Sequence, residues 1–211
     1  MLLHDLADVA QLHLQALPDS FFASLGPRFL RRYYESFVAS PYGVAFVATH
    51  EQQLCGFVVG SSAAGPHSAW VVRQRGARLA IAGVLAMLLR PMVLAHFVST
   101  RSSRYAMGLY RRLRGGSGTG PNASATAELP AVLAHVAVHT AWRRIGLGEV
   151  LVRAFESEAR NKGARTVELV TLEGPEGAGR FYERLGFSHE RSRQDEDGRR
   201  WLYFRSSTAE R

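Results

Sequence analysis

A chain of 211 residues with 46% hydrophobic and 21% charged residues has the size and composition of one globular domain, with or without a large insertion. The single cysteine, Cys55, excludes an internal disulfide and a cysteine-based metal site. The net charge of +8 favours an anionic partner, and arginine carries almost all of it because Lys162 is the only lysine. Asp5 and Asp8 interrupt the apolar start, so we expect no signal peptide and a cytoplasmic location.

The first forty residues predict two helices. Residues 5–17 place Leu6, Val9 and Leu12 on one broad face, as in an amphipathic helix. A second helix is expected from Pro27, because proline is accepted at the first helical position. Its apolar side is formed by Phe29, Leu30, Tyr33, Tyr34 and Phe37.

Two β-rich runs follow these helices, at residues 44–49 and 54–61. The polar tetrapeptide 50–53 joins them, which predicts an antiparallel hairpin. Gly56 and Gly60 lie inside the second run and indicate a bulge or a close approach of the backbone to a neighbour.

Residues 52–127 are unusual because they contain no Asp or Glu. Their nine arginines carry more positive charge than the net +8 of the whole chain, so the rest of the chain is slightly acidic. These arginines are Arg73, Arg75, Arg78, Arg90, Arg101, Arg104, Arg111, Arg112 and Arg114. Residues 79–89 are continuously apolar, but this run is too short to span a bilayer. We expect helices over about residues 74–89, 92–100 and 103–113, then a flexible linker over residues 115–122.

A strand, a glycine loop and a helix then follow in direct succession. The strand is expected over residues 128–138 and the helix over residues 147–162. The inward face of this helix is expected to consist of Leu147, Val150, Leu151, Ala154 and Phe155.

The loop between them contains two glycines, Gly146 and Gly148, where the backbone turns tightly and leaves its amides uncovered. The helix start adds free N–H groups and the positive end of the helix dipole. Such a combination can form a cradle for a pyrophosphate. It also occurs as ordinary turn chemistry, and the two arginines inside the loop, Arg143 and Arg144, favour the polyanion.

The last quarter of the chain predicts a strand, a short helix and a hairpin. The strand covers residues 165–172. The inner stripe of the short helix is expected to be Ala178, Phe181 and Leu185, with Tyr182 at its edge. The hairpin is expected to pair residues 187–193 with residues 199–204 around Asp197-Gly198.

Two of these motifs resemble those of a known family. The pattern Arg143-x-x-Gly146-x-Gly148 resembles the acyl-CoA pyrophosphate loop of the GNAT superfamily of N-acetyltransferases. Residues 181–187, Phe-Tyr-Glu-Arg-Leu-Gly-Phe, resemble the family's next segment, whose tyrosine is often the general acid. Both motifs stand in the family's order, and the resemblance covers about residues 133–204. The first third of the chain is compatible with it, whereas the stretch between is not covered.

The resemblance implies an α/β fold of the mixed α+β kind, with a central mixed, mostly antiparallel sheet and flanking helices. Leu2 and Leu3 would be the remnant of the family's opening strand. Residues 1–211 would form one domain, and residues 62–127 would be a helical, basic insertion between two strands that the family usually joins directly.

The resemblance also implies an enzyme, an acyl-CoA-dependent N-acetyltransferase that uses acetyl-CoA as co-substrate and needs no metal. The acetyl group would pass by direct attack to a primary amine of a small molecule, such as an amino sugar or an amino-acid derivative. The residues expected to bind acetyl-CoA are Val136, Ala137, Val138, Arg143, Arg144, Ile145, Gly146, Leu147, Gly148 and Glu149.

Tyr182 is the expected general acid, which would protonate the departing thiolate. The general base is left open between Glu173 and His135, with His139 and a water relay as further candidates. The family often has an asparagine seven residues before this tyrosine. Pro175 stands there instead, which removes one side-chain contact to CoA or water.

Several alternatives stay open. The insertion could pack on the core and shape the acceptor site, rest as a basic amphipathic surface on an anionic membrane, or form a homodimer interface. The acceptor could instead be a peptide or protein amine, or a lipid-linked amine at a membrane. A non-catalytic CoA-binding module is a further hypothesis. Nucleic acid is not favoured as a partner, because no recognised module accompanies the basic charge.

Overall fold

A six-stranded sheet in the order β1-β2-β3-β4-β6-β5 forms the centre of the computed structural model, which describes residues 1–88, 130–174, 177–195 and 197–208. Its strands are β1 (Gly43–His50), β2 (Gln53–Ser61), β3 (Ala131–Val138), β4 (Thr166–Leu172), β5 (Ser188–Gln194) and β6 (Arg200–Ser207). Only β3 and β4 pair in parallel, and all other neighbours are antiparallel. The expected mixed, mostly antiparallel sheet is therefore confirmed, as are both predicted hairpins.

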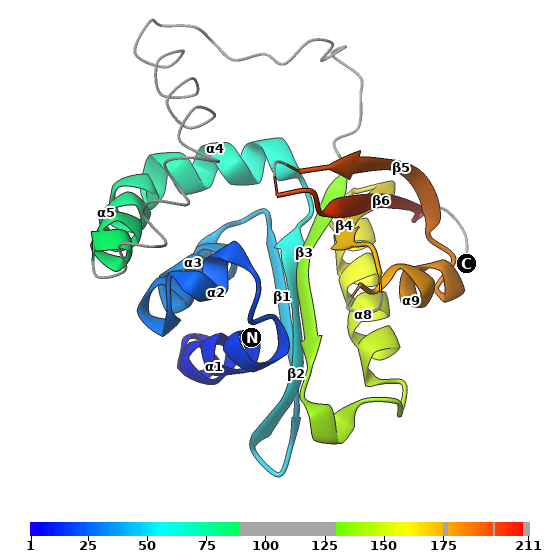
Figure 1. Ribbon diagram of the computed structural model, residues 1–211, viewed down its shortest axis with the longest axis horizontal. Coiled ribbons are helices and arrows are strands. Elements are labelled where there is room, and N and C mark those ends of the chain that lie inside the picture. Colours follow the sequence, from blue (N-terminus) through cyan, green and yellow to red (C-terminus); the bar gives the residue numbers. More distant parts are fainter. Residues whose placement is uncertain (89–129, 175–176, 196, 209–211) are drawn as a thin grey trace, which may run out of the picture.

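Helices cover both faces of the sheet (Figure 1). One face carries α1 (Leu6–Ala16), α2 (Phe21–Ser24) and α3 (Pro27–Ala39), and the other carries α8 (Leu147–Asn161) and α9 (Gly179–Arg184). The opening strand expected at Leu2 and Leu3 is wrong. A short 3-10 helix, Leu3–Asp5, stands there, because the Asp5 carboxylate accepts the Leu2 N–H at 2.6 Å and turns the chain into α1.

The α1–α3 face of the sheet is covered by apolar helix positions at the expected spacing. Buried Leu6, Val9 and Leu12 of α1 pack with Leu30, Tyr34 and Phe37 of α3 and with Phe57 and Val59 of β2. The helix α3 starts where it does because Gly26 adopts a φ of 83° and Pro27 follows at the first position.

The α8 face has a separate core. Leu151, Val152 and Phe155 pack against strand residues that include Val58, Val167 and Phe204. A Cβ added at Gly60 would lie 2.6 Å from the Phe155 ring, so the close backbone approach expected at this glycine is confirmed.

One inward position of α8 differs from the expectation. Val150 is 62% exposed, and Glu156 takes a buried position instead. The carboxylate of Glu156 tolerates burial because Arg153 Nη1 donates to it at 2.9 Å and Ser206 Oγ donates to it at 3.0 Å. A pattern of hydrophobic residues alone assigns no acid to a core face, so the burial of Glu156 was not predicted, whereas Leu151 and Phe155 are buried as expected.

The helix expected over about residues 74–89 is present as α5 (Gly76–Leu88), which packs beside α3 (Figure 1). A further helix that was not expected, α4 (Ala64–Gln74), precedes it. Arg75 lies at the joint, and its Nη1 reaches Glu35 Oε1 of α3 at 2.6 Å. The helices expected over residues 92–100 and 103–113 and the linker over 115–122 lie outside the described residues. Within the described ranges, no helix is long and apolar enough to cross a membrane.

Candidate active site

The sheet opens between its two parallel strands. Pairing of β3 with β4 is limited to Ala131 with Val167 and Val132 with Glu168. Beyond that point β3 stays paired with β2 as far as Val138, while β4 stays paired with β6. The C-terminal half of β3 therefore presents an edge to which no described strand is paired.

The backbone of β3 aims specific amides at this gap. His139 N–H donates to Cys55 O of β2 at 2.8 Å, and alternate residues of an antiparallel strand point their amides the same way. Ala137 thus turns its N–H toward β2, whereas Val136 and Val138 turn theirs toward the gap. In agreement, Val138 O faces away from β2 and accepts Arg143 Nε at 3.0 Å. Val136 and Val138 are placed to meet a carbonyl group, and Ala137 is not.

A β-bulge sets which side chains of β3 face which layer. His135 pairs with Val59 and Leu133 pairs with Gly60, so Ala134 has no opposite residue. Ahead of the bulge Leu133 packs on the α8 side, and after it His135 faces the α1–α3 side. Without this extra residue, alternation would direct His135 toward α8.

His135 enters a cluster of polar aromatic residues. Its Nε2 lies 3.2 Å from the Tyr33 hydroxyl, and its ring meets the His13 ring edge-on at 5.1 Å. His13 is fully buried, and its two nitrogens contact the Tyr34 hydroxyl at 2.5 Å and Ser20 Oγ at 2.7 Å. The predicted site lacked His13, although it shares a helix face with Val9, because only the fold brings it to His135.

The surroundings keep both histidines neutral. Burial lowers the pKa of His13 to about 4. Burial and then the neighbouring His13 lower the pKa of His135 to about 3. A group with so low a pKa is a weak proton acceptor, so His135 has the character of a hydrogen-bonding group more than that of a general base.

The loop before α8 is an open row of amide donors. Gly146 caps the helix in the left-handed region at φ 86°, and Arg144 also has a positive φ, of 65°. The amides of residues 144–149 donate to no other described residue. The first amide of this segment that is hydrogen-bonded is that of Val150, which donates to Gly146 O. Six successive N–H groups at the start of a long helix suit a pyrophosphate, and the exposed side chain of Arg144 adds a positive charge.

Tyr182 is more buried than expected. It is 5% exposed, with Phe187 and Phe204 against its ring, whereas Phe181 is only half-buried and lies beside Gly148. The expected arrangement, with Phe181 inward and Tyr182 at the edge, is therefore wrong, because the C-terminal hairpin closes over the tyrosine.

The Tyr182 phenol carries its proton at neutral pH. Burial raises its pKa well above the usual value, so the phenol holds a transferable proton but is a weaker acid than an exposed tyrosine. The hydroxyl has no hydrogen bond to another described residue, and no buried polar side-chain atom of the described part lacks a partner, so the hydroxyl retains access to solvent.

The other base candidates are held elsewhere. Glu173 follows β4, and its exposed carboxylate pairs with Arg200 Nη1 at 3.5 Å. His139 Nδ1 accepts the Ala141 N–H at 3.3 Å and so caps a short 3-10 helix, Thr140–Trp142. Pro175 lies outside the described residues. The described part contains no group of three His, Cys, Asp or Glu residues suited to a metal ion.

A pocket of about 430 Å³ lies between the α1–α2 connection and the β5–β6 turn. Its lining includes Asp19, Ser20 and Phe21 from the first segment and Asp197 and Arg199 from the second. Ser20 also contacts His13, so the pocket wall is joined to His135 of β3 through one side chain. Sequence reasoning missed this pocket because its two walls are far apart in the chain.

The acetyltransferase (GNAT) domain model matches residues 111–189, which contain the open edge of β3, the amide loop and Tyr182. This chain carries a GNAT acetyltransferase domain. Its donor substrate class is accordingly an acyl-CoA, and the amide loop before α8 fits the pyrophosphate of such a donor. A comparison with curated proteins finds no match.

Solved structures share the GNAT fold at low sequence identity. A GNAT-family protein from Desulfovibrio desulfuricans is 15% identical, with 99% of this chain and 95% of that chain covered and a TM-score of 0.58. An aminoglycoside 6'-N-acetyltransferase from Enterococcus faecium is 13% identical, with 96% and 90% covered and a TM-score of 0.54. Ard1 from Thermoplasma volcanium is 17% identical, with 100% and 95% covered and a TM-score of 0.55.

Proposed function

We propose that this GNAT domain transfers an acetyl group from acetyl-CoA to a primary amine of a small molecule that carries more than one positive charge. The observation that supports this acceptor class is the pocket between the α1–α2 connection and the β5–β6 turn, whose lining has two carboxylates and one arginine. Asp19 has no ion-pair partner among the described residues, whereas Asp197 is paired with Arg199 at 3.1 Å. A volume of about 430 Å³ is in the range of small-molecule sites.

Solved structures of similar fold support coenzyme A as the carrier of the acetyl group. One solved GNAT structure at a TM-score of 0.56 is an aminoglycoside 6'-N-acetyltransferase complexed with coenzyme A. In the present chain, we assign pyrophosphate binding to the amides of residues 144–149 and to Arg144. We assign polarisation of the thioester carbonyl to the Val136 or Val138 amide at the open edge of β3.

The transfer then requires two proton movements. As the amine nitrogen bonds to the carbonyl carbon, the carbon–sulfur bond breaks, and Tyr182 gives its phenolic proton to the departing thiolate. The attacking amine loses a proton in the same reaction. Because His135 is a weak base and Glu173 is paired with Arg200, we assign this proton to water in the pocket. His135 and Tyr33 orient the amine.

A thiol-release assay with a panel of amines tests the proposal. The panel contains amino sugars, linear diamines, matched monoamines and peptides with a free N-terminus. We expect turnover with the small polycations, and Asp19→Asn should lower kcat/KM for dications more than for monoamines. Turnover with peptides alone would refute the small-molecule acceptor, and acetyl-CoA binding without turnover on any amine would refute the enzymatic assignment.

A further inference from the structure

The helix α5 carries apolar residues on two faces. Its inner face, with Ala82 and Met87, packs against Leu25 and Phe29. Its outer face has four aliphatic side chains that are between 50% and 63% exposed: Ile81, Val84, Leu85 and Leu88. Their spacing of three, one and three residues places them in one stripe along the helix. A helix on a protein surface normally turns polar residues outward, so this stripe marks an interaction surface.

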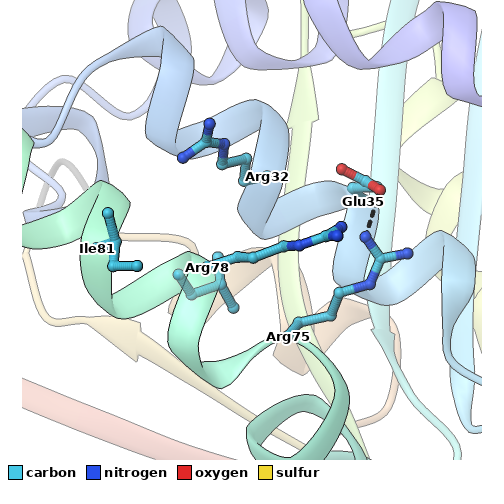
Figure 2. A pocket seen from close by; sticks show the side chains of 6 residues that line it. Arg32, Glu35, Arg75, Arg78 and Ile81 are labelled. Atoms are coloured by element: carbon cyan, nitrogen blue, oxygen red, sulfur yellow. Dashed lines mark hydrogen bonds and ion pairs between the residues drawn. The ribbon is translucent and has the colours of Figure 1, made fainter.

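Positive charge gathers at one end of the stripe. A pocket of about 370 Å³ between α3 and α5 is lined by Arg32, Glu35, Arg75, Arg78, Leu79 and Ile81. Arg75 and Arg78 extend toward Glu35, and Arg32 projects from α3 on the other side of the pocket (Figure 2). Only Arg75 has an acidic partner in the described part, at 2.6 Å, so the lining keeps a net charge of two positive units.

The stripe and the arginines form one continuous surface. Ile81 belongs to both, since it lines the pocket and begins the stripe. Arg78 precedes Ile81 by three residues, which places both on the same side of α5. No Asp or Glu occurs anywhere in residues 52–127, so this part of the sequence has no carboxylate that would repel an anion.

The chemistry of this surface determines what can occupy it. Guanidinium groups bind phosphate oxygens with two parallel hydrogen bonds, and aliphatic side chains leave water for an apolar phase. An anionic bilayer offers phosphates beside acyl chains in this same order. We propose that α5, together with Arg32, Arg75 and Arg78, docks the protein on an anionic phospholipid bilayer. The aliphatic stripe enters the acyl boundary, and lipid phosphates occupy the arginine pocket.

Cosedimentation of the full chain with vesicles tests this proposal. We expect binding to phosphatidylcholine vesicles that contain phosphatidylglycerol, and little binding to pure phosphatidylcholine. Binding should weaken as salt is raised, because the arginines act through charge. Protein that stays in the supernatant with the anionic vesicles at low salt would overturn the proposal.

Two double variants separate charge from apolar contact. Arg32→Gln with Arg78→Gln should lower partitioning by about fivefold for each arginine. Ile81→Ser with Leu85→Ser should lower it by at least tenfold, since each aliphatic side chain contributes to insertion. All four residues are exposed, so thermal unfolding of both variants should match that of the wild type.

Matched controls lie on the opposite face of the sheet and at the N-terminus. Arg160→Gln with Arg180→Gln removes two exposed arginines, and Leu2→Ser with Leu3→Ser removes two exposed aliphatic residues. Both should bind within about twofold of the wild type. If the control and test arginine variants lose equal vesicle binding, the effect depends only on net charge, and the proposed docking site is overturned. A vesicle-free dimer that the Ile81 and Leu85 substitutions dissociate would assign the stripe to a second copy, which also overturns it.

Discussion

The amide loop before α8 and the His13 cluster on the α1–α3 side differ in how their polar groups are paired. On the α8 side, six backbone amides over residues 144–149 have no partner in the described part. On the α1–α3 side, His13 is fully buried and both its nitrogens are paired. Unpaired N–H groups at a helix start can bind an anion, whereas a fully hydrogen-bonded neutral cluster holds its side chains in fixed positions. The first arrangement would bind acetyl-CoA, and the second would position the acceptor amine.

The largest expected effect comes from covering the open amides. Gly148 lies in the first turn of α8, and an added Cβ would already meet the Phe181 ring at 3.4 Å. Gly148→Val should therefore weaken acetyl-CoA binding on the order of 10²-fold while the protein stays folded, because each hydrogen bond to a charged phosphate that the side chain blocks contributes about 1.5–3 kcal/mol. Isothermal titration measures the affinity, and circular dichroism checks the fold.

The matched control for this variant is Gly65→Ala. Gly65 lies on α4, away from the amide loop, and an added Cβ would meet no atom within 4 Å. Its acetyl-CoA affinity should equal that of the wild type. Unchanged affinity in folded Gly148→Val would remove the amide loop from the donor site.

Tyr182→Phe should lower kcat by roughly 10–100-fold, at the low end of what a positioned acid contributes, because a thiolate is already a fair leaving group. Its hydroxyl has no hydrogen-bond partner in the described part, so the melting temperature should hardly change. Tyr34→Phe is the contrasting variant, because it removes the contact to His13 and should lower stability by about 1–3 kcal/mol. A shifted melting temperature with normal kcat in Tyr182→Phe would make this tyrosine structural.

Low pH should reduce the stability of the fold through His13 on the α1–α3 side. The unfolded pKa of a histidine is about 6.5, and burial lowers that of folded His13 to about 4. The unfolded state therefore binds more protons between these values, and the stability that neutral His13 provides is lost as the pH falls through this window. At pH 5 the loss for this group is about 2 kcal/mol.

Urea denaturation at pH 7.5 and pH 5 measures this dependence. His13→Gln should be less stable at pH 7.5 and show a smaller further loss at pH 5. The exposed residue His50 provides the control, and His50→Gln should keep the full pH dependence. An identical pH dependence in His13→Gln and the wild type would show that His13 is not the responsible group.

The smallest expected effect concerns the loop arginines. Arg144→Ala should raise the KM for acetyl-CoA about tenfold with kcat unchanged, because a phosphate contact binds ground and transition states alike. Arg143 also holds Val138 O at 3.0 Å, so Arg143→Ala should raise KM and additionally loosen the end of β3. A normal KM with reduced kcat in Arg144→Ala would contradict its role as a phosphate anchor.

Local sequence patterns predicted the part of the fold from β3 to α9 well. A strand, a glycine loop and an amphipathic helix are each specified within about fifteen residues, so periodicity and helix-start chemistry suffice. The burial of Tyr182 was not predictable in this way, because Phe204 of a distant strand closes over it. Helix α4 was missed because Gly65 and Pro66 at its start indicate a loop.

The acceptor side was the least predictable part of the site. Its residues are far apart in the chain: Tyr33 contacts His135, and Asp19 and Asp197 line the same pocket. His13 was counted among scattered histidines, because no spacing rule connects α1 to β3. Sequence reasoning located the donor side because a loop and a helix start form it, whereas the acceptor side exists only after the sheet and helices have assembled.

The bulge at Ala134 has a consequence for how the chain tolerates changes in length. A bulge bends its strand and increases the local twist, and this one lies two residues after Val132, where pairing with β4 ends. Deleting Ala134 would straighten β3 and let its edge continue along β4, which would close the gap. The connection between β2 and β3 takes up residues 62–130, and the entropic cost of closing a connection rises only slowly with its length. A family of such chains should vary freely by dozens of residues there, and not by a single one at position 134.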